Sequence, residues 1–515
     1  MQFAFVTYGG DGKQTPADRS QVRSHCMKGR NKRDGSRRSN REVRQAAKRV
    51  RTNADTSTVP IIKCRSSSAT AQGENVSILR QVEQRSELPD EGLWARPLQA
   101  PRGFVFPSVV DEFANAVGQM PESLMRQCKT ASLNRSQIRL KIYLVMAFNR
   151  IAEASYPLVE IAVNFSDHAS FSSIWPSFDK SFLHTILFIN SAVNDWTQNQ
   201  PLAKSSQFHL GRTLTLLNKK LATGTLHLDD TTIYTVMLLA IVSSTSGDYD
   251  ASNAHMAGLQ RLVEIRSSHG YLWVNPITQF KLECLDLMWC LTAGGAPLFL
   301  KGPVPWDLAF ARPSPSVDTE LSLALSQAFT DPRLIIAFQD LQWLTELVNV
   351  HAGSNMRLNT SEFQPVLSSI QTRLLHLKDL LVDMPGEWLC LGMLAFLATM
   401  FRVPGRQVSY EHLADRLRRA CRTLVPSESS SISQSISAPM STNSGLQSVL
   451  RWLAIVCGVA VFGASEQWLR ELWDGIAEPN LLWAETRTEL KRVMWIGCIH
   501  DERGRRIFAA LKLER

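Results

Sequence analysis

His255 and two neighbouring carboxylates could do acid–base chemistry. Asp248 and Asp250 belong to the sequence GDYD, and His255 follows where a helical pattern begins. A histidine within reach of a carboxylate can serve as a general base. An enzyme of unknown class that uses these three residues is therefore one hypothesis. Because no standard catalytic motif accompanies them, the pattern favours a histidine near a helix start that makes a structural hydrogen bond.

The cysteines and histidines do not form a metal-ligand pattern. Nine cysteines are scattered through the chain and no C-x-x-C occurs, which excludes thiolate zinc sites of the usual spacing. Cys284 and Cys290 lie six residues apart in an apolar stretch, which favours packing in the core over a redox or metal role. His25 and Cys26 are adjacent, but no further ligands stand nearby. We expect no metal, and the scattered thiols are typical of a reducing compartment.

The stretch GGDGKQT resembles the end of a phosphate-binding loop but lacks two of its residues. Thr7 stands where the loop needs its first glycine, and Gln14 follows Lys13 where a serine or threonine should bind magnesium. The motifs G-x-G-x-x-G, H-E-x-x-H and G-x-S-x-G are also absent from the chain. We therefore predict no catalytic residue and no cofactor, and we do not expect an enzyme.

The positive charge of the chain is concentrated at its amino end. Residues 1–65 hold 16 Lys and Arg against 5 Asp and Glu, a net charge of +11, whereas the other 450 residues carry 40 against 42, a net of −2. Such asymmetry indicates a polyanionic partner. The residues that we expect to act in nuclear import or nucleic-acid contact are Arg23, Lys28, Arg30, Lys32, Arg33, Arg37 and Arg38.

Import or non-specific nucleic-acid contact is the interpretation that this basic cluster favours. Specific DNA reading would need a rigid element in a groove, and no folded module is evident in the cluster. An inert, solvated tail stays an alternative. The cluster has no interleaved aromatic or leucine face, so we do not expect a membrane partner.

Composition divides the chain into an arm, a linker and a body. Residues 1–65 form the basic arm, which we expect to be mostly disordered, and residues 66–100 a polar linker. Residues 101–515 are rich in periodic apolar residues and are interrupted by a serine-rich loop at 426–445. The apolar runs 388–401 and 453–464 are shorter than a membrane span, so we predict buried helices there. The opening residues show no secretory signal.

The body must be helical to account for its apolar spacing. Leu210, Leu214, Leu217 and Leu221 recur at i, i+4, i+7 and i+11, on one helix face. The next stretch, 231–244, is almost wholly apolar and predicts a central helix capped by Asp229 or Asp230, and Ser252 or Asn253 should cap the helix after it. The same period recurs in two more sets, Leu282, Leu285, Met288 and Trp289, and Leu413, Leu417, Cys421 and Leu424. The late tryptophans, Trp452, Trp468, Trp473, Trp483 and Trp495, also have helix-like spacing and suit a core. With no hairpin signal, the fold class is all-α, a large irregular helical domain behind the basic arm.

Four pieces of the central region resemble the fungal-specific transcription factor domain family. They are an LN-x-x-L helix end at Leu217–Leu221, a TI…V helix at Thr232–Val236, the GD turn at Gly247–Asp248 and an H-x-x-GL helix at His255–Arg266. The family's R-G-G ending is replaced here by RSSHG. The stretches LRWLAIVCGVAVFGASEQWLRELW and LKRVMWIGCIHDERG resemble its late tryptophan helices and its carboxyl-terminal helix, and RSHCMKGRNKR resembles a short amino-terminal motif of members without a zinc cluster.

The resemblance implies a nuclear, all-α regulator of transcription. Full-length members carry six zinc-binding cysteines that position a DNA-reading helix. Only Cys26 and Cys64 lie in the first hundred residues of this chain, so its own zinc-cluster reader is not expected. We predict action through the transcription machinery or another DNA-binding protein, or non-specific DNA contact through the arm, and the resemblance allows a homodimer. The alternatives are a helical protein–protein scaffold without a chromatin role and the His255 enzyme.

Overall fold

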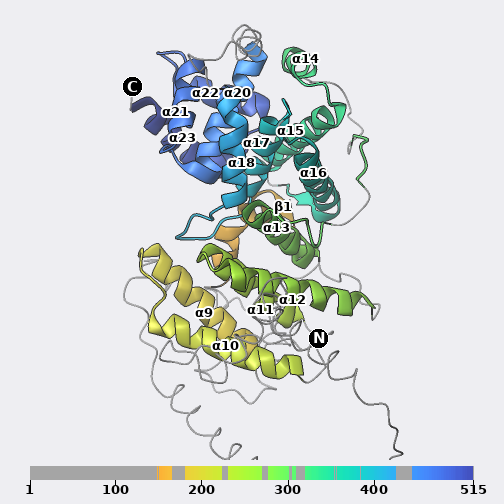
Figure 1. Cartoon of the computed structure of the whole chain (residues 1–515), viewed down its shortest axis with the longest axis vertical. Coiled ribbons are helices and arrows are strands. Elements are labelled where there is room, and N and C mark those ends of the chain that lie inside the picture. Colours follow the sequence, from red (N-terminus) through yellow and green to blue (C-terminus); the bar gives the residue numbers. More distant parts are fainter. Residues whose placement is uncertain are drawn as a thin grey trace, which may run out of the picture. The chain divides into compact units, whose positions relative to one another are not determined.

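A computed structural model describes the chain at residues 148, 150–164, 180–222, 230–268, 276–300, 304–308, 319–352, 354, 356–382, 384–424 and 444–513. These residues are mostly helical, which confirms the predicted all-α class (Figure 1). The basic arm 1–65, the linker 66–100 and the first part of the predicted body, 101–147, lie outside the described residues.

Most of the described elements are helices. Residues 150–155 are helical, and the named elements are α8 Pro157–Ile161, β1 Val163–Asn164, α9 Lys180–Thr197, α10 Lys204–Ala222, α11 Asp230–Thr245, α12 Tyr249–Ser268, α13 Pro276–Ala293, α14 Thr319–Ala328, α15 Pro332–Ala352, β2 Leu358–Asn359, α16 Thr360–Leu380, α17 Glu387–Ala398, α18 Glu411–Cys421, the short turn η4 Arg422–Leu424, α20 Ser444–Cys457, the π-helix η5 Gly458–Phe462, α21 Gln467–Ile476, α22 Trp483–Val493 and α23 Gly497–Leu513.

One pair of strands, which the sequence did not predict, ties the start of the described chain to its middle. β1 and β2 are two residues each and run parallel, with Val163 opposite Leu358. The Leu358 amide also donates a 2.8 Å hydrogen bond to the Ala162 carbonyl. Strands this short satisfy a few backbone groups locally and leave the helical class unchanged.

Helices α9 to α12 form two tightly packed pairs, α9 with α10 and α11 with α12, and α11 also contacts α9 and α13 (Figure 1). On α10, Leu214 and Leu217 are buried and Leu210 and Leu221 are half-buried, so the predicted leucine face is confirmed. Almost every residue of α11 is buried, as predicted for a central helix. Its apolar residues lie all round the axis because neighbours cover it on several sides.

The predicted cap of α12 is wrong. The helix begins at Tyr249, so Ser252 and Asn253 already lie inside it. Asp248 takes the capping role, because its Oδ1 accepts a 3.1 Å hydrogen bond from the Ala251 amide. A side-chain oxygen that accepts from an amide of the first turn satisfies one of the helix's open donors. Asp250, which lies in the first turn, also suits the positive end of the helix dipole.

Helix α13 anchors the chain that follows it through one buried carboxylate. Asp286 is fully buried and accepts hydrogen bonds from the amides of Leu298, Phe299 and Leu300, at 2.9, 2.7 and 2.9 Å. The predicted core positions Leu282, Leu285 and Met288 are buried, and Trp289 is half-buried. Three amides on one carboxylate fix this turn against α13, since each would otherwise be a buried donor without an acceptor.

Helices α15 to α18 are held by apolar packing and by two buried ion pairs. The Arg373 guanidinium of α16 donates to Asp340 of α15 at 2.8 Å, and both side chains are almost wholly buried. Arg416 of α18 binds Glu387 of α17 and the Lys378 carbonyl. Every residue of α17 is buried, which confirms the prediction for the run 388–401. The residues Leu413, Leu417 and Cys421 of α18 are also buried, and Leu424 in η4 is half-buried.

Helix α20 differs from its prediction in two ways. It begins at Ser444, so the last two residues of the predicted serine-rich loop 426–445 are helical, while residues 425–443 lie outside the described residues. Together α20 and η5 run for 19 residues and by length and composition could cross a membrane, although the apolar run alone is shorter. Because 83% of the most apolar window is buried inside the protein, we assign it to the core.

The late tryptophans pack the carboxyl-terminal helices together, as predicted. Trp452, Trp473 and Trp495 are almost fully buried, and the Trp452 Nε1 donates a 2.7 Å hydrogen bond to the Met494 carbonyl. Trp468 is buried, and Trp483 is half-buried, 6.3 Å from the Trp495 ring centroid. Buried indoles that have an acceptor for the N–H combine large apolar area with a fixed orientation.

Candidate functional site

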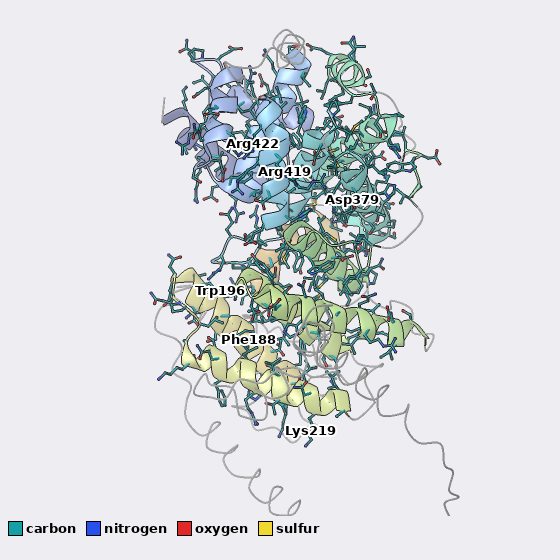
Figure 2. The ribbon with its side chains drawn as sticks, in the orientation of Figure 1. Phe188, Trp196, Lys219, Asp379, Arg419 and Arg422 are labelled. Atoms are coloured by element: carbon teal, nitrogen blue, oxygen red, sulfur yellow. The ribbon has the colours of Figure 1, made fainter. Side chains whose placement is uncertain are left out.

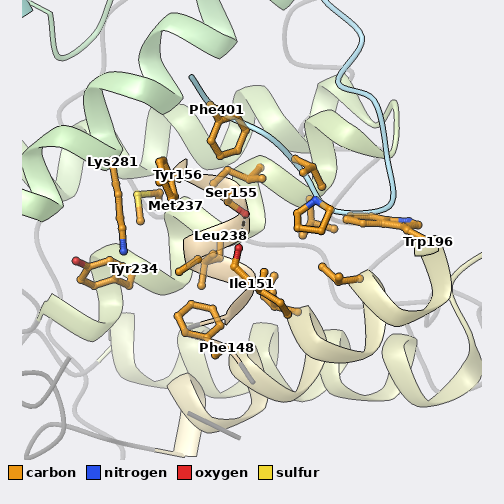
Figure 3. A pocket seen from close by; sticks show the side chains of 17 residues that line it. Phe148, Ile151, Ser155, Tyr156, Trp196, Tyr234, Met237, Leu238, Lys281 and Phe401 are labelled. Atoms are coloured by element: carbon orange, nitrogen blue, oxygen red, sulfur yellow. Dashed lines mark hydrogen bonds between the residues drawn. The ribbon is translucent and has the colours of Figure 1, made fainter. Parts of the chain in front are cut away.

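An apolar cavity of about 50 Å³ lies between residues 148–156, α9, α11, α13 and the turn at 401–404 (Figure 3). Its walls are mainly Phe148, Ile151, Ile189, Val193, Trp196, Met237, Leu238, Ile241, Val242, Phe401, Val403 and Pro404. Trp196 lies near the carboxyl end of α9 (Figure 2) and is 3% exposed. No aspartate or glutamate is among the described residues that line it.

Among the described residues that line this cavity, the one cation is Lys281 of α13. It is 7% exposed, and its Nζ lies 5.6 Å from the centroid of the Tyr156 ring and 5.4 Å from that of the Tyr234 ring. Figure 3 shows the lysine side chain reaching toward Tyr234 on the side of the cavity away from Trp196. Two aromatic faces attract an ammonium through their quadrupoles. Burial lowers the pKa of Lys281 to about 8, so the amine stays mostly protonated at pH 7.

The hydroxyl groups around Lys281 differ in their partners. The Tyr234 hydroxyl is hydrogen-bonded to the Thr278 hydroxyl at 2.9 Å, and the Ser155 hydroxyl donates to the Ile151 carbonyl at 2.7 Å. Among the described residues, neither the Lys281 Nζ nor the Tyr156 hydroxyl has a hydrogen-bond or ion-pair partner. Tyr156 is 6% exposed, and burial raises the pKa of its phenol well above the usual value. The contacts of Lys281 here are therefore with the two tyrosine rings.

A larger groove of about 580 Å³ shares Phe401, Val403 and Pro404 with the apolar cavity and is lined by arginines. The part of its lining that the structure describes contains four cations, Arg402, Arg406, Arg503 and Arg506, and no acidic residue. Arg506 is paired with Glu502 outside the lining. The Arg402 guanidinium donates to the Ile499 carbonyl, but its buried Nε has no acceptor among the described residues.

The arginines in the groove repel one another. Burial, followed by the charge of Arg503, lowers the pKa of Arg402 to about 10. Burial and the neighbouring Arg506 also lower the pKa of Arg503. Glu502 compensates part of this charge, and four arginines clustered beside it still create a positive potential that attracts anions. The groove is therefore a second positive region of this chain, besides the amino-terminal arm.

The residues of the predicted acid–base set lie outside the linings of the two cavities described above. His255 is 7% exposed on α12, and burial lowers the pKa of its imidazole to about 4, which leaves it a weak base at neutral pH. Asp248 and Asp250 are exposed, and Asp248 caps the helix. None of the three lines the apolar cavity or the arginine groove.

The predicted core positions of Cys284 and Cys290 are confirmed. Cys284 and Cys290 are buried free thiols of α13, and burial raises the pKa of both. No group of three metal-ligating side chains occurs in the described part of the chain. His25, Cys26, the GGDGKQT stretch and the seven predicted import or nucleic-acid residues, Arg23, Lys28, Arg30, Lys32, Arg33, Arg37 and Arg38, lie outside the described residues.

The sequence analysis missed Lys281, although a signal was present. The α13 sequence FKLECLDLMWC places Lys281, Glu283 and Asp286 in a helix whose apolar residues predict burial. A charged residue inside a buried helix needs a partner or a function. Glu283 accepts a hydrogen bond from Ser368, and Asp286 accepts hydrogen bonds from amides of the turn after α13. Of these three residues, Lys281 is the one that lines the cavity.

Comparisons with known proteins give no relative for this chain. No protein-family model matches it, and neither a curated protein nor a solved structure does.

Proposed function

We propose that this protein is a nuclear regulator of transcription that acts through its helical body and has no zinc-cluster DNA reader of its own. The observation that carries the proposal is the division of charge, +11 in residues 1–65 and −2 in the other 450. A basic arm joined to a near-neutral body suits a chain that is directed to, or held near, a polyanion. The sequence resemblance to the fungal-specific transcription factor domain supports the same function.

The proposal assigns base-specific DNA reading to a partner. Contacts between arginines and phosphates supply affinity and salt dependence but carry little sequence information. The partner is therefore another DNA-binding protein or a component of the transcription machinery, and the arm adds non-specific contact with DNA. A homodimer is compatible with this assignment. No catalytic step is assigned to His255.

Nuclear import is tested by replacing Lys28, Arg30, Lys32, Arg33, Arg37 and Arg38 with alanine in a fluorescently tagged chain. The proposal expects the variant to remain in the cytoplasm. A matched control replaces six exposed basic residues of the body, some labelled in Figure 2: Lys204, Lys219, Arg419, Arg422, Lys491 and Arg505. The control should enter the nucleus as the unchanged chain does. Equal nuclear signal for the arm variant would remove the import role.

Chromatin association is tested by crosslinking the tagged chain to the genome, beside the arm variant supplied with an added import signal. Discrete sites for both chains would place recruitment in the helical body and its partner. Sites for the unchanged chain alone would place recruitment in the arm. With discrete sites for neither chain, the protein is a helical scaffold without a chromatin role and the proposal fails.

Direct DNA contact has two candidate surfaces, the arm and the arginine groove, and salt dependence separates them. Each phosphate contact that is lost lowers the slope of log affinity against log salt by about 1. The arm variant should lower the magnitude of this slope, because it loses several phosphate contacts. The double variant Arg503→Ala, Arg506→Ala should leave the slope unchanged. The opposite pattern would move the DNA contact to the groove.

A further inference from the structure

Two separate elements supply the positive charge of the arginine groove. Arg503 and Arg506 lie three residues apart on α23, so they share one helix face, and Ile507 lies on the same face. The turn that follows α17 supplies Arg402 and Arg406. Two pairs of guanidinium groups, about a hundred positions apart in the sequence, therefore line one groove.

These charges are only partly compensated by the described residues. Glu502 pairs with Arg506, but the two side chains are 78% and 74% exposed, and an ion pair so exposed contributes little. Neither Arg406 nor Arg503 forms an ion pair with a described residue. The Arg402 guanidinium donates to a backbone carbonyl and is likewise not paired with a carboxylate among the described residues.

Repulsion between the arginines favours an anion in the groove. The charge of Arg503 lowers the pKa of Arg402, and the charge of Arg506 lowers the pKa of Arg503, in each case after the larger effect of burial. The pKa of Arg402 is still about 10, so its guanidinium is charged at neutral pH. A bound anion adds an attraction to every arginine of the cluster, which an isolated surface arginine cannot offer.

The shape of the guanidinium group identifies the anion. Each guanidinium presents a planar fork of N–H donors, which matches two oxygens of a phosphate group. A phosphate monoester carries close to two negative charges at pH 7.5 and has three terminal oxygens, so it can accept from more than one arginine at once. A monocarboxylate has one charge and two oxygens and would leave most of the cluster without a partner.

The groove has room for more than a phosphate. Its volume of about 580 Å³ lies in the range of small-molecule sites, which is about 300–1,000 Å³. Val408, Tyr410, Val459 and Ile507 add apolar surface to its lining, so the ligand should carry an apolar or aromatic part beside the phosphate. The π-helix η5 also lines the groove, and this rare backbone form is frequent at functional sites.

We propose that Arg503 and Arg506, together with Arg402 and Arg406, bind the phosphate group of a small phosphate monoester whose apolar part lies against α23 and η5. The site gives the helical body a small-molecule ligand. It is independent of the proposed nuclear function and of the basic arm, so purified protein is sufficient to test it.

The test is calorimetric titration of the full-length protein with phenyl phosphate at pH 7.5, beside inorganic phosphate and benzyl alcohol. Phenyl phosphate carries both the charge and the ring, and each of the other two probes carries one of them. Phenyl phosphate should bind at least about threefold more tightly than inorganic phosphate, because its ring buries apolar surface in the groove. It should bind at least about tenfold more tightly than benzyl alcohol, which offers no charged acceptor.

Variants locate the phosphate. Arg503→Ala with Arg506→Ala removes two exposed guanidinium groups and should lower the affinity for phenyl phosphate at least about tenfold. The matched control is Arg419→Ala with Arg422→Ala, two exposed arginines of the same spacing that do not line the groove (Figure 2), and it should leave the affinity unchanged. The arm variant should also keep its affinity. Circular dichroism and the thermal midpoint establish that each variant is folded.

Five outcomes would count against the proposal. Phenyl phosphate that binds no better than benzyl alcohol, or that binds the groove variant as tightly as the unchanged protein, would remove the phosphate site. A loss in the arm variant as large as in the groove variant would place the phosphate on the arm. Equal affinity for phenyl phosphate and inorganic phosphate would reject the apolar part of the ligand. Displacement of phenyl phosphate from the arm variant by a short DNA duplex would make the groove a nucleic-acid surface instead.

Discussion

Acid should destabilise the helical body through His500, a buried histidine of α23. Its ring is 1% exposed, between Phe396 and Trp495 at centroid distances of 5.0 and 4.8 Å. The Ile496 amide donates to Nδ1 at 3.1 Å, so Nδ1 accepts and the proton resides on Nε2. Nε2 then donates to the Thr399 hydroxyl at 2.6 Å, and that hydroxyl donates to the Phe396 carbonyl at 2.6 Å. A second proton, on Nδ1, would break the first of these bonds.

The sign and size of the effect follow from the pKa. Burial, followed by the charge of Arg402, lowers the pKa of His500 to about 3, against about 6.5 in an unfolded chain. Between these two values the unfolded state binds more protons, so the free energy of unfolding falls as the pH falls through this window. At a pH well above 6.5 both states are neutral and His500 adds no pH dependence. Between pH 7.5 and 5.0, His500 becomes protonated in the unfolded chain but stays neutral in the folded protein. Over the roughly 1.5 pH units between 6.5 and 5.0, this lowers the free energy of unfolding by about 2 kcal/mol.

The assay is urea unfolding of the full chain at pH 7.5 and 5.0, followed by tryptophan fluorescence, with His500→Gln beside the unchanged protein. Glutamine keeps an amide that can donate toward Thr399 but does not titrate. We expect the variant to be less stable than the unchanged protein at pH 7.5, because it loses the ring packing. On acidification it should lose about 2 kcal/mol less than the unchanged protein.

The comparison of two pH values also removes contributions from other groups. Burial lowers the pKa of His209 and of His255 to about 4 as well, and both remain present in each chain. The matched control is Leu490→Ala, a fully buried residue of α22 without a titrating group. It should cost about 2–5 kcal/mol at both pH values and keep the acid loss of the unchanged protein. If His500→Gln loses as much on acidification as the unchanged protein, the assignment of the acid effect to His500 is wrong.

Three further predictions concern packing and buried polar groups. Arg373→Met removes the guanidinium from the buried Asp340 and should lower the free energy of unfolding by about 3–5 kcal/mol in urea, whereas adding Asp340→Leu should restore most of the loss. Asp286→Ala leaves three amides without their acceptor and should lower the thermal midpoint much more than Asp286→Asn, which keeps one oxygen. A Cβ at Gly392 would meet Leu453 Cδ1 at 2.6 Å, so Gly392→Ala should lower the free energy of unfolding by about 1–3 kcal/mol. A Cβ at Gly475 in α21 would meet nothing within 4 Å, so Gly475→Ala should raise it by about 0.5–1 kcal/mol. Equal thermal midpoints for the two variants would contradict the packing argument.

Much of the secondary structure could be predicted from spacing alone. The leucines of α10 and the apolar runs of α11 and α17 have the period or the length of buried helices, and the structure confirms them. This information is local, because residues three and four apart share a helix face whatever the rest of the chain does. The division of charge between residues 1–65 and the rest is likewise a property of sequence alone.

The helix boundaries needed more than spacing. Ser252 and Asn253 are good capping residues, yet Asp248 caps α12 because the turn before Tyr249 places its carboxylate over the Ala251 amide. Ser444 could be read as loop from its composition, but packing of α20 against its neighbours extends the helix to it. Several residues with similar propensity compete at a helix end, and tertiary contacts choose among them.

The candidate site was decided by the tertiary structure. The sequence by itself determined that α13 is buried and that it contains a lysine. Only the packing of distant segments determined that Lys281 faces Tyr156 and Tyr234, in a cavity closed by Trp196 and Phe401. The physical reason is that a helix period encodes which residues share a face, whereas the neighbour that the face meets depends on the shapes of other helices far away in sequence.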